Sequence, residues 1–418
     1  MALGHATAAP NPHGAPMQNR MSQTEFIALI AMMFATIAFS MDSMLPALPE
    51  IGAQLSPDNI NRAQMILTAF ILGMGAGTFI TGPLSDAFGR KPVILVGAII
   101  YIAAAFVAWR SSSLEVVLAA RVVQGLGAAG PRVVAMAVVR DLYSGREMAK
   151  MVSIAMMIFT IFPAIAPLMG AGIIALTGWR GIFLAFILFS LISTLWMGLR
   201  LPETLAPENR RAFRPHLLAA ALREMARHPT VRLSIIVQTL CLASLFSMIL
   251  SVQQIYDVIF GQAKNFPIYF GVVALVSGSA SLLNAAIVMR IGMRRIVTWS
   301  LGAQICLSGL MLVTSEIGLP LAAYFWIFVV WQACVFFIMG MTMGNLNAIG
   351  MEPMGHIAGM AASIMGAIST VGAALLSAPV GLLFDGTILP LAAGIFLLSI
   401  IGFALMLKMG RIEAREAL

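Results

Sequence analysis

The decamer GPLSDAFGRK at residues 82–91 decides the fold, because it gathers one acid, two bases and two glycines between two long apolar runs. The runs lie near residues 64–83 and 92–109. Each has about the 20 residues that a helix needs to cross a bilayer core of roughly 30 Å. A short charged turn between two such runs is typical of a membrane-spanning hairpin. Since backbone groups in lipid must be hydrogen-bonded within the segment, both runs are predicted to be helices.

The same pattern extends along the whole chain of 418 residues. Hydrophobic residues make up 60% of it and charged residues 10%, with a mean hydropathy of +0.95. A soluble domain is about half apolar and about a quarter charged, so soluble, disordered and fibrous proteins are excluded. Runs of spanning length lie near residues 26–47, 64–83, 92–109, 115–139, 151–175, 180–200, 231–253, 267–289, 296–314, 320–341, 357–381 and 389–409. The sequence therefore predicts an all-α membrane protein with twelve transmembrane helices.

The longest polar segment, residues 201–230, divides these runs into six and six. Its stretch from Pro215 to Arg227 is predicted to form an amphipathic surface helix. The stretch EMAKMVSI at the start of the fifth run is weakly similar to HIAGMAAS at the start of the eleventh. This similarity indicates a duplicated six-helix unit. The expected parts are a flexible cytoplasmic tail (1–20), an N-terminal bundle (21–200), a cytoplasmic linker (201–230), a C-terminal bundle (231–410) and a second cytoplasmic tail (411–418).

The basic residues predict the orientation of the chain. Most of the 25 Lys and Arg residues fall in loops on the side of the termini, so the positive-inside rule places both termini in the cytoplasm. Their clustering between apolar runs explains the net charge of +8 as a topology signal rather than as a nucleic-acid surface. Among the basic residues, only Arg121 and Arg132 lie well inside a run rather than at one of its ends.

Asp42 is the only acid well inside an apolar run. At 1.5 Å per residue, its carboxylate and the guanidinium of Arg121 are expected at similar depths. Burial favours a neutral carboxyl group and a nearby guanidinium favours a charged one, so such a pair is suited to bind and release a proton in one cycle. The alternative for Asp42 is a helix-end carboxylate at the aqueous interface, because Pro46 and Pro49 follow it.

Within the decamer, Asp86 is expected to accept hydrogen bonds from a helix N-terminus or from an arginine at the same level, such as Arg140. This contact would hold two bundles together in one state and release them in another. An ordinary short turn between two spans is the alternative.

The fifth run carries two prolines and several glycines. Pro163 and Pro167 remove backbone hydrogen bonds, and Gly170 and Gly172 remove bulk, so a kink and a close helix contact are expected. Generic packing of small residues is the alternative for each of them.

Three glutamines inside the runs, Gln124, Gln238 and Gln332, are candidates for substrate binding, with interhelical hydrogen bonding as the alternative. No metal site is expected, because Glu352 and His356 lack a third ligand nearby. No P-loop, G-x-S-x-G or H-E-x-x-H motif is present either, so neither an ATP-driven pump nor an enzyme is predicted.

The decamer is similar to the loop signature of the major facilitator superfamily, G-x-x-x-D-(R/K)-x-G-R-(R/K). The matching residues are Gly82, Asp86, Gly89, Arg90 and Lys91. Ala87 departs from the pattern, because a base is usual at that position.

Further stretches resemble the twelve-span drug exporters of this superfamily. Pro167, Gly170 and Gly172 fit the antiporter signature G-P-x-x-G-G, whereas Ala166 and Ala171 depart from it. The segments MDSMLPALPEIG, RVVQGLGAAG, VVRDLY and GWRGIF resemble the bicyclomycin/chloramphenicol-type subfamily.

This resemblance implies two pseudo-symmetric six-helix bundles that export small amphiphilic drugs in exchange for protons by alternating access. It implies protonation at Asp42 with Arg121 as its charge partner, a gating loop around Asp86, and a place for the fifth helix at the seam between the bundles. A proton gradient would supply the energy without a cofactor. The expected setting is the bacterial cytoplasmic membrane, and the expected state is a monomer.

Two alternative functions remain at this point. A transporter of a sugar or an amino acid should have more polar side chains inside its spans than this chain has. An uncoupled channel should show a pore-lining polar stripe or a carbonyl filter, and neither is evident in the sequence.

Overall fold

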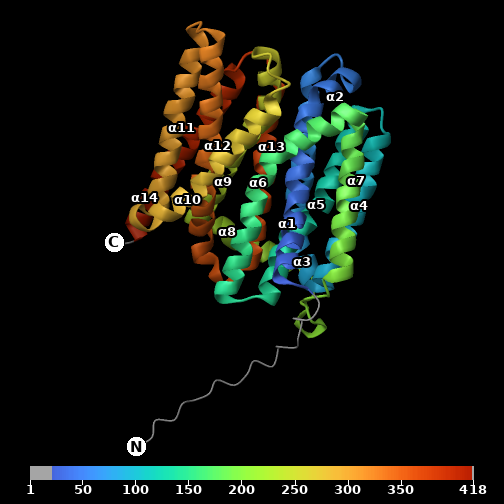
Figure 1. The fold of residues 1–418 in the computed structure, drawn as a ribbon. Coiled ribbons are helices and arrows are strands. Elements are labelled where there is room, and N and C mark those ends of the chain that lie inside the picture. Colours follow the sequence, from blue (N-terminus) through green and yellow to red (C-terminus); the bar gives the residue numbers. More distant parts are fainter. Residues whose placement is uncertain (1–20, 417–418) are drawn as a thin grey trace, which may run out of the picture.

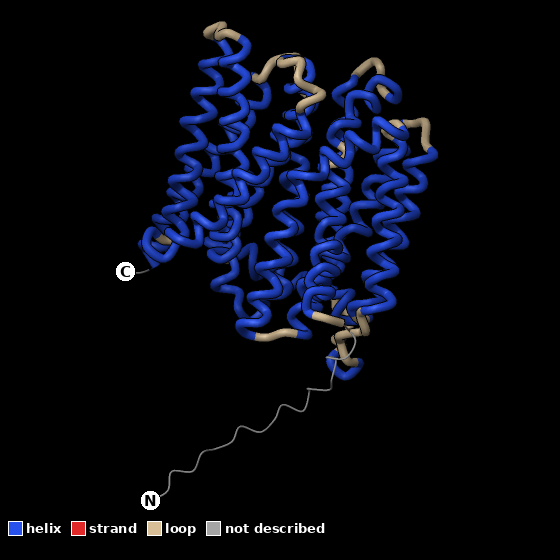
Figure 2. The backbone as a smooth tube through the Cα atoms, viewed as in Figure 1, coloured by secondary structure: helices blue, strands red, loops and turns tan. Residues whose placement is uncertain are grey.

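A computed structural model describes residues 21–416 as helices joined by short loops (Figures 1 and 2). The predicted tail at residues 1–20 lies outside the described residues. The twelve long helices are α1 (Gln23–Asp42), α3 (Met65–Phe88), α4 (Arg90–Arg110), α5 (Leu114–Leu142), α6 (Gly145–Thr177), α7 (Arg180–Arg200), α9 (Pro229–Gln254), α10 (Phe266–Ile291), α11 (Met293–Glu316), α12 (Leu321–Met351), α13 (Ala358–Leu382) and α14 (Leu389–Glu416).

Short helices connect or extend the long ones. They are η2 (Leu45–Ala47), α2 (Leu48–Leu55), η3 (Ile60–Gln64), η4 (Pro207–Asn209), α8 (Pro215–Arg227), the π-helical η5 (Ile255–Ile259) and η6 (Glu352–Ile357). The predicted amphipathic helix is α8, with the bounds expected from the sequence. It packs the buried Leu218, Ala221 and Met225 against residues of α9 and α13.

Among the described residues, 10 helical stretches are long and apolar enough to cross a membrane. One of these, Leu321–Leu382, contains both α12 and α13, and α6 contributes a shorter apolar stretch, Ile161–Thr177. The helices α6 and α12 extend past the predicted apolar runs, because helical hydrogen bonding continues beyond the point where apolar composition ends.

The two sets of six helices pack in the same way. In the first set the contacting pairs are α1–α6, α3–α5, α4–α5, α4–α7, α1–α5 and α1–α7. The pairs at the matching positions of the second set are α9–α13, α10–α12, α11–α12, α11–α14, α9–α12 and α9–α14. This recurrence is the pseudo-symmetry that the sequence predicted.

Two pairs of helices, α3–α13 and α6–α10, form the main seam between the two sets. Small residues bring the helices close together there. A Cβ atom at Gly75 of α3 would lie 2.7 Å from a methyl group of Val371, and one at Gly271 of α10 would lie 2.6 Å from the carbonyl oxygen of Ala164. The missing side chains let the helix backbones approach each other.

Candidate functional site

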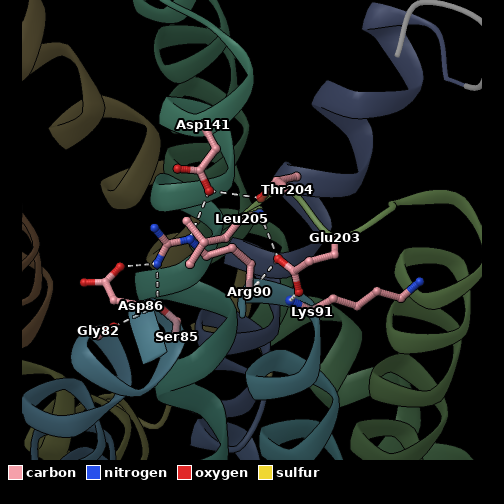
Figure 3. Close-up of polar contacts among 9 residues, drawn as sticks. All are labelled: Gly82, Ser85, Asp86, Arg90, Lys91, Asp141, Glu203, Thr204 and Leu205. Atoms are coloured by element: carbon pink, nitrogen blue, oxygen red, sulfur yellow. Dashed lines mark hydrogen bonds and ion pairs between the residues drawn. The ribbon is translucent and has the colours of Figure 1, made fainter. Parts of the chain in front are cut away.

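The decamer forms the end of α3, a tight turn at Gly89 and the start of α4, at the end of the molecule where α1 begins (Figures 1 and 3). Gly89 ends α3 with a φ of 104°, a conformation that side-chain-bearing residues rarely adopt. A Cβ atom there would also lie 2.6 Å from Oε2 of Glu203. Glycine is therefore required at this position both by the backbone and by the neighbouring carboxylate.

Arg90 is the centre of a polar network around this turn (Figure 3). Its side chain is largely buried and forms ion pairs with Asp86 of α3 and Asp141 of α5. Its Nε atom donates to Asp141 at 3.0 Å, and Nη1 donates to the hydroxyl of Ser85 at 2.8 Å. The arginine thus joins the ends of three helices.

Glu203, in the segment after α7, caps the N-terminus of α4 (Figure 3). Its carboxylate accepts hydrogen bonds from the backbone N–H groups of Arg90 at 2.9 Å and of Lys91 at 3.1 Å. A carboxylate at this place satisfies unpaired amides and interacts favourably with the helix dipole. The backbone amide of Arg211 also donates to the carbonyl oxygen of Asp86 at 2.9 Å, so the linker binds the turn at two points.

The arginine beside Asp86 is not the one suggested by the sequence. Arg140 is exposed, and no ion pair is recorded for it within the described part of the chain; Arg90 contacts Asp86 instead. Sequence reasoning also missed Asp141 and Glu203. Their signals were an acid directly after Arg140 and an acid just after the sixth apolar run.

Gly82 places the network next to the seam. A Cβ atom at this residue of α3 would lie 3.1 Å from the hydroxyl oxygen of Ser363 on α13. A cavity of about 280 Å³, lined by Asp86, Arg90, Arg140 and the first turns of α13, opens beside it. Movement of α13 against α3 would therefore change the contacts of the turn.

We predict that Glu203→Gln lowers the free energy of unfolding by about 1–2 kcal/mol, because the α4 cap loses its charge and part of its hydrogen bonding. Chemical denaturation of the purified protein measures this change. Glu208→Gln is the matched control, since Glu208 is exposed in the same linker. Equal stability of the two variants would contradict the capping role.

Asp42 and Arg121 lie at similar levels but do not form a direct ion pair in this structure. Asp42 ends α1 and is 5% exposed, and no hydrogen bond or ion pair is recorded for its carboxyl group among the described residues. The fully buried guanidinium of Arg121 donates to Gln124 at 2.7 Å, to the carbonyl oxygen of Ser40 at 2.8 Å and to that of Ile66 at 3.3 Å. The arginine thus binds the helix that ends in Asp42 rather than the carboxylate itself.

The surroundings of Arg121 contain two residues that sequence reasoning missed. The centroid of the Phe70 ring lies 4.3 Å from the guanidinium carbon, a distance at which a cation–π interaction is favourable. Tyr101 is buried and shares a hydrogen bond of 2.5 Å with the hydroxyl of Ser40. In the sequence Tyr101 has only the signal of an isolated polar aromatic residue in the third run.

The four positions of the antiporter motif differ in their packing. Pro163 and Pro167 lie inside α6, which continues as one helix through both. A Cβ atom at Gly170 would lie 2.1 Å from the carbonyl oxygen of Ser43, directly after Asp42, whereas one at Gly172 would meet nothing within 4 Å. Gly170 therefore lets α6 touch the end of α1.

The three candidate glutamines are buried and make contacts between or within helices. Gln124 accepts the hydrogen bond from Arg121, Gln238 donates to Asn347 at 3.0 Å, and Gln332 accepts from the hydroxyl of Tyr256 at 2.9 Å. The amide nitrogens of Gln124 and Gln332 have no hydrogen-bond partner within the described chain. Both side chains are fully enclosed by protein in this structure.

At the opposite end of the molecule, neutral amides join the two sets of helices. This cluster (Asn61, Gln64 and Gln254) is called the outer amide cluster because the positive-inside rule predicts that the other end is cytoplasmic. Asn61 donates to the carbonyl oxygens of Leu382 at 3.2 Å and Phe384 at 2.7 Å. Gln254 of α9 donates to Asn61 at 3.1 Å and accepts from Gln64. Hydrogen bonds between uncharged groups therefore join the two sets at this end, and they must break if the two sets separate here.

We predict that Asn61→Ala shifts the population toward an outward-open form by about tenfold or more, because it removes three hydrogen bonds that are each worth about 1 kcal/mol. Spin labels at Asp58 and Asp385, both exposed at this end, would report a longer distance between the two sets. Gln262→Ala is the control, since Gln262 bonds only with Asn265 of its own set through its side chain. An unchanged distance distribution in Asn61→Ala would count against a gating role.

Comparison with known proteins places this geometry in context. The family model for the Major Facilitator Superfamily matches residues 28–377. The chain is 29% identical over 358 residues to a bicyclomycin resistance protein homolog of Haemophilus influenzae, covering 84% of this chain and 87% of that protein. It is 35% identical over 187 residues to a chloramphenicol resistance protein of Pseudomonas aeruginosa, covering 44% of each.

Among solved structures, the fold is similar to that of a D-xylose–proton symporter, with a TM-score of 0.71. The alignment covers 92% of this chain and 97% of the symporter at 12% sequence identity. This similarity supports the arrangement of the helices and carries no information about the transported molecule.

Proposed function

Because the chain belongs to the Major Facilitator Superfamily, a family of secondary transporters rather than enzymes, we propose that it exports small amphiphilic compounds in exchange for protons. It is a multi-pass membrane protein, and its relatives include bacterial proteins named for resistance to bicyclomycin and chloramphenicol. These relatives support an exporter of small molecules. We further propose a location in the bacterial cytoplasmic membrane, with both termini in the cytoplasm, and function as a monomer.

The environment of Asp42 is the observation that supports proton coupling. This carboxyl group is buried at the end of α1, and within the described chain it has no recorded ionic partner. Arg121 is held by Gln124 and by the carbonyl oxygen of Ser40, two residues before Asp42. A proton binding to or leaving Asp42 changes the charge at the end of α1, the helix that Arg121 holds through Ser40, so the proton and the position of α1 become linked.

The packing of α6 suggests how that change reaches the seam. Gly170 contacts the backbone after Asp42, and Ala164, about one and a half turns earlier, contacts Gly271 of α10 in the second set. In this proposal, a displacement at the end of α1 reaches the other set through α6, which contacts both. We propose that residues 21–200 and 231–410 move as two bodies around this seam during alternating access.

The turn around Arg90 and the outer amide cluster lie at opposite ends of the molecule, and each would hold the two sets together at its own end. In the proposed cycle, Asn61 and Gln254 separate when the outer end opens, and the contacts of Gly82 and Asp86 near α13 change at the other end. Gln124, Gln238 and Gln332 are proposed to offer hydrogen bonds to the cargo. The surrounding methionines and phenylalanines would accommodate apolar surface of varied shape.

A panel of toxic amphiphilic compounds tests the function directly. Growth of cells that lack the protein and of cells that overproduce it is compared, with and without a protonophore. We expect resistance from overproduction that disappears when the proton gradient is collapsed. Resistance that survives the protonophore would argue against antiport, and absence of resistance across the panel would favour a metabolite as the cargo.

A further inference from the structure

The pseudo-symmetry matches the Arg90 turn with a second turn, between α10 and α11. Gly292 there has a φ of 88°, close to the 104° of Gly89, and it likewise ends one helix and begins the next. The residues that follow are Met293, Arg294 and Arg295, in place of Arg90 and Lys91. The two turns therefore present the N-termini of α4 and α11 in equivalent positions.

The two helix N-termini differ in what covers them. At α4, the carboxylate of Glu203 accepts from the first two backbone amides. At α11, no described side chain is recorded as accepting a hydrogen bond from the amides of Met293 or Arg295, and an open pocket of about 520 Å³ lies there instead. Because a carboxylate caps the equivalent helix N-terminus in the first set, we expect an anion to fit at the N-terminus of α11.

The walls of the pocket favour the same chemistry. Arg295 lines it with a positive charge, and the carboxylate of Glu352 is the only acidic group among the described residues of the lining. Arg294 also lines the pocket, but its guanidinium lies next to Gly410 of α14. The N-terminus of α9 also reaches the pocket through His228 and Thr230, so two helix dipoles direct their positive ends toward it.

Two polar groups in the pocket wall lack a partner. Thr230 is 8% exposed, and its hydroxyl has no recorded hydrogen bond to any described residue. The Nδ1 atom of His228 is buried and also unpartnered within the described chain. Buried polar groups in proteins are normally hydrogen-bonded, so the hydroxyl of Thr230 in the pocket wall indicates a ligand with acceptor oxygen atoms, whereas the enclosed Nδ1 atom of His228 does not face the pocket.

We propose that this pocket, formed by His228, Thr230, Gly292, Arg294, Arg295 and Glu352, binds a phosphate group. The phosphate would cap α11 as Glu203 caps α4, with Arg295 and Thr230 as its main side-chain contacts. The group can belong to an anionic phospholipid of the surrounding leaflet or to a soluble phosphate compound. This site is separate from the proposed export pathway, and binding to it does not depend on the proposed cargo.

Two probes distinguish the sources, using the full chain in phosphatidylcholine nanodiscs. The first is phosphatidylglycerol added to the disc, with the retained lipid counted by native mass spectrometry. The second is radiolabelled inorganic phosphate, measured by equilibrium dialysis. We expect saturable binding of at least one probe, weakened about tenfold or more in Arg295→Gln and in Thr230→Val, because each loses a hydrogen bond to a charged ligand.

Arg290→Gln is the matched control, since Arg290 is an exposed base in the last turn of α10 and does not line the pocket. Binding of the lipid alone assigns the site to a headgroup, and binding of inorganic phosphate assigns it to a soluble compound. Absence of saturable binding of both probes, or equal weakening by Arg290→Gln, would overturn the proposal. Transport activity enters neither measurement, so a failure here is distinct from a failure of the export hypothesis.

Discussion

Replacing Asp42 with Asn is expected to abolish substrate-driven proton flux in proteoliposomes. The amide has nearly the same shape as the carboxyl group but cannot release a proton, so the step that links proton movement to α1 is lost. Substrate binding should persist, because the Arg121 cluster does not hydrogen-bond to the Asp42 side chain in this structure. A pH-sensitive dye inside the vesicles measures the flux after substrate is added.

Two variants control this experiment. Asp58→Asn removes an exposed acid at the same end of the molecule and should leave the flux unchanged. Asp42→Glu retains a titratable group and should restore part of the flux. If Asp42→Asn transports protons as the unmodified protein does, the coupling site lies elsewhere.

Gly170→Ala is expected to impair both folding stability and export. The added Cβ atom would lie 2.1 Å from the carbonyl oxygen of Ser43, a backbone atom that can yield only if the end of α1 moves. Overpacking of this kind costs about 1–3 kcal/mol of unfolding free energy. Ser43 follows Asp42 directly, so we also expect slower export. The export rates of the variant and the unmodified protein are compared at equal amounts of folded protein.

The matched variant is Gly172→Ala, two residues further along the same helix. Its Cβ atom would meet nothing within 4 Å, and the better helix propensity of alanine should leave stability unchanged or raise it by up to about 1 kcal/mol. Chemical denaturation and export assays compare the pair. Equal behaviour of the two variants would show that the close contact of α6 with α1 is not required.

The site could be predicted only in part. The charges and glycines of the decamer singled out Asp86 as a candidate, and the resemblance to a family signature added Gly82, Gly89, Arg90 and Lys91. The sequence could not identify Glu203 or Asp141 as their partners. The carboxylate of Glu203 reaches α4 across more than a hundred residues of chain, and nothing in its local sequence specifies that contact.

The Asp42–Arg121 pair shows a similar limit. Helical rise along two separate spans placed both residues at matching depths, which the structure supports through the contact of Arg121 with Ser40. Depth does not fix the direction in which a side chain points around its helix. The guanidinium faces Gln124 and two backbone carbonyl oxygens, and this choice is made by the packing of α5 against α1 and α3.

By itself the sequence determined that this protein consists of apolar helices crossing a bilayer in two groups of six, because burial of backbone polar groups in lipid leaves few other structures and hydrophobic length sets each span. It also determined where the turns fall, since charge and glycine mark them. Only the tertiary structure decided which helices touch, that Gly170 meets the end of α1 while Gly172 meets nothing, and that α4 is capped whereas α11 faces an open pocket. These features depend on contacts between segments far apart in the chain, and local composition and periodicity contain no information about them.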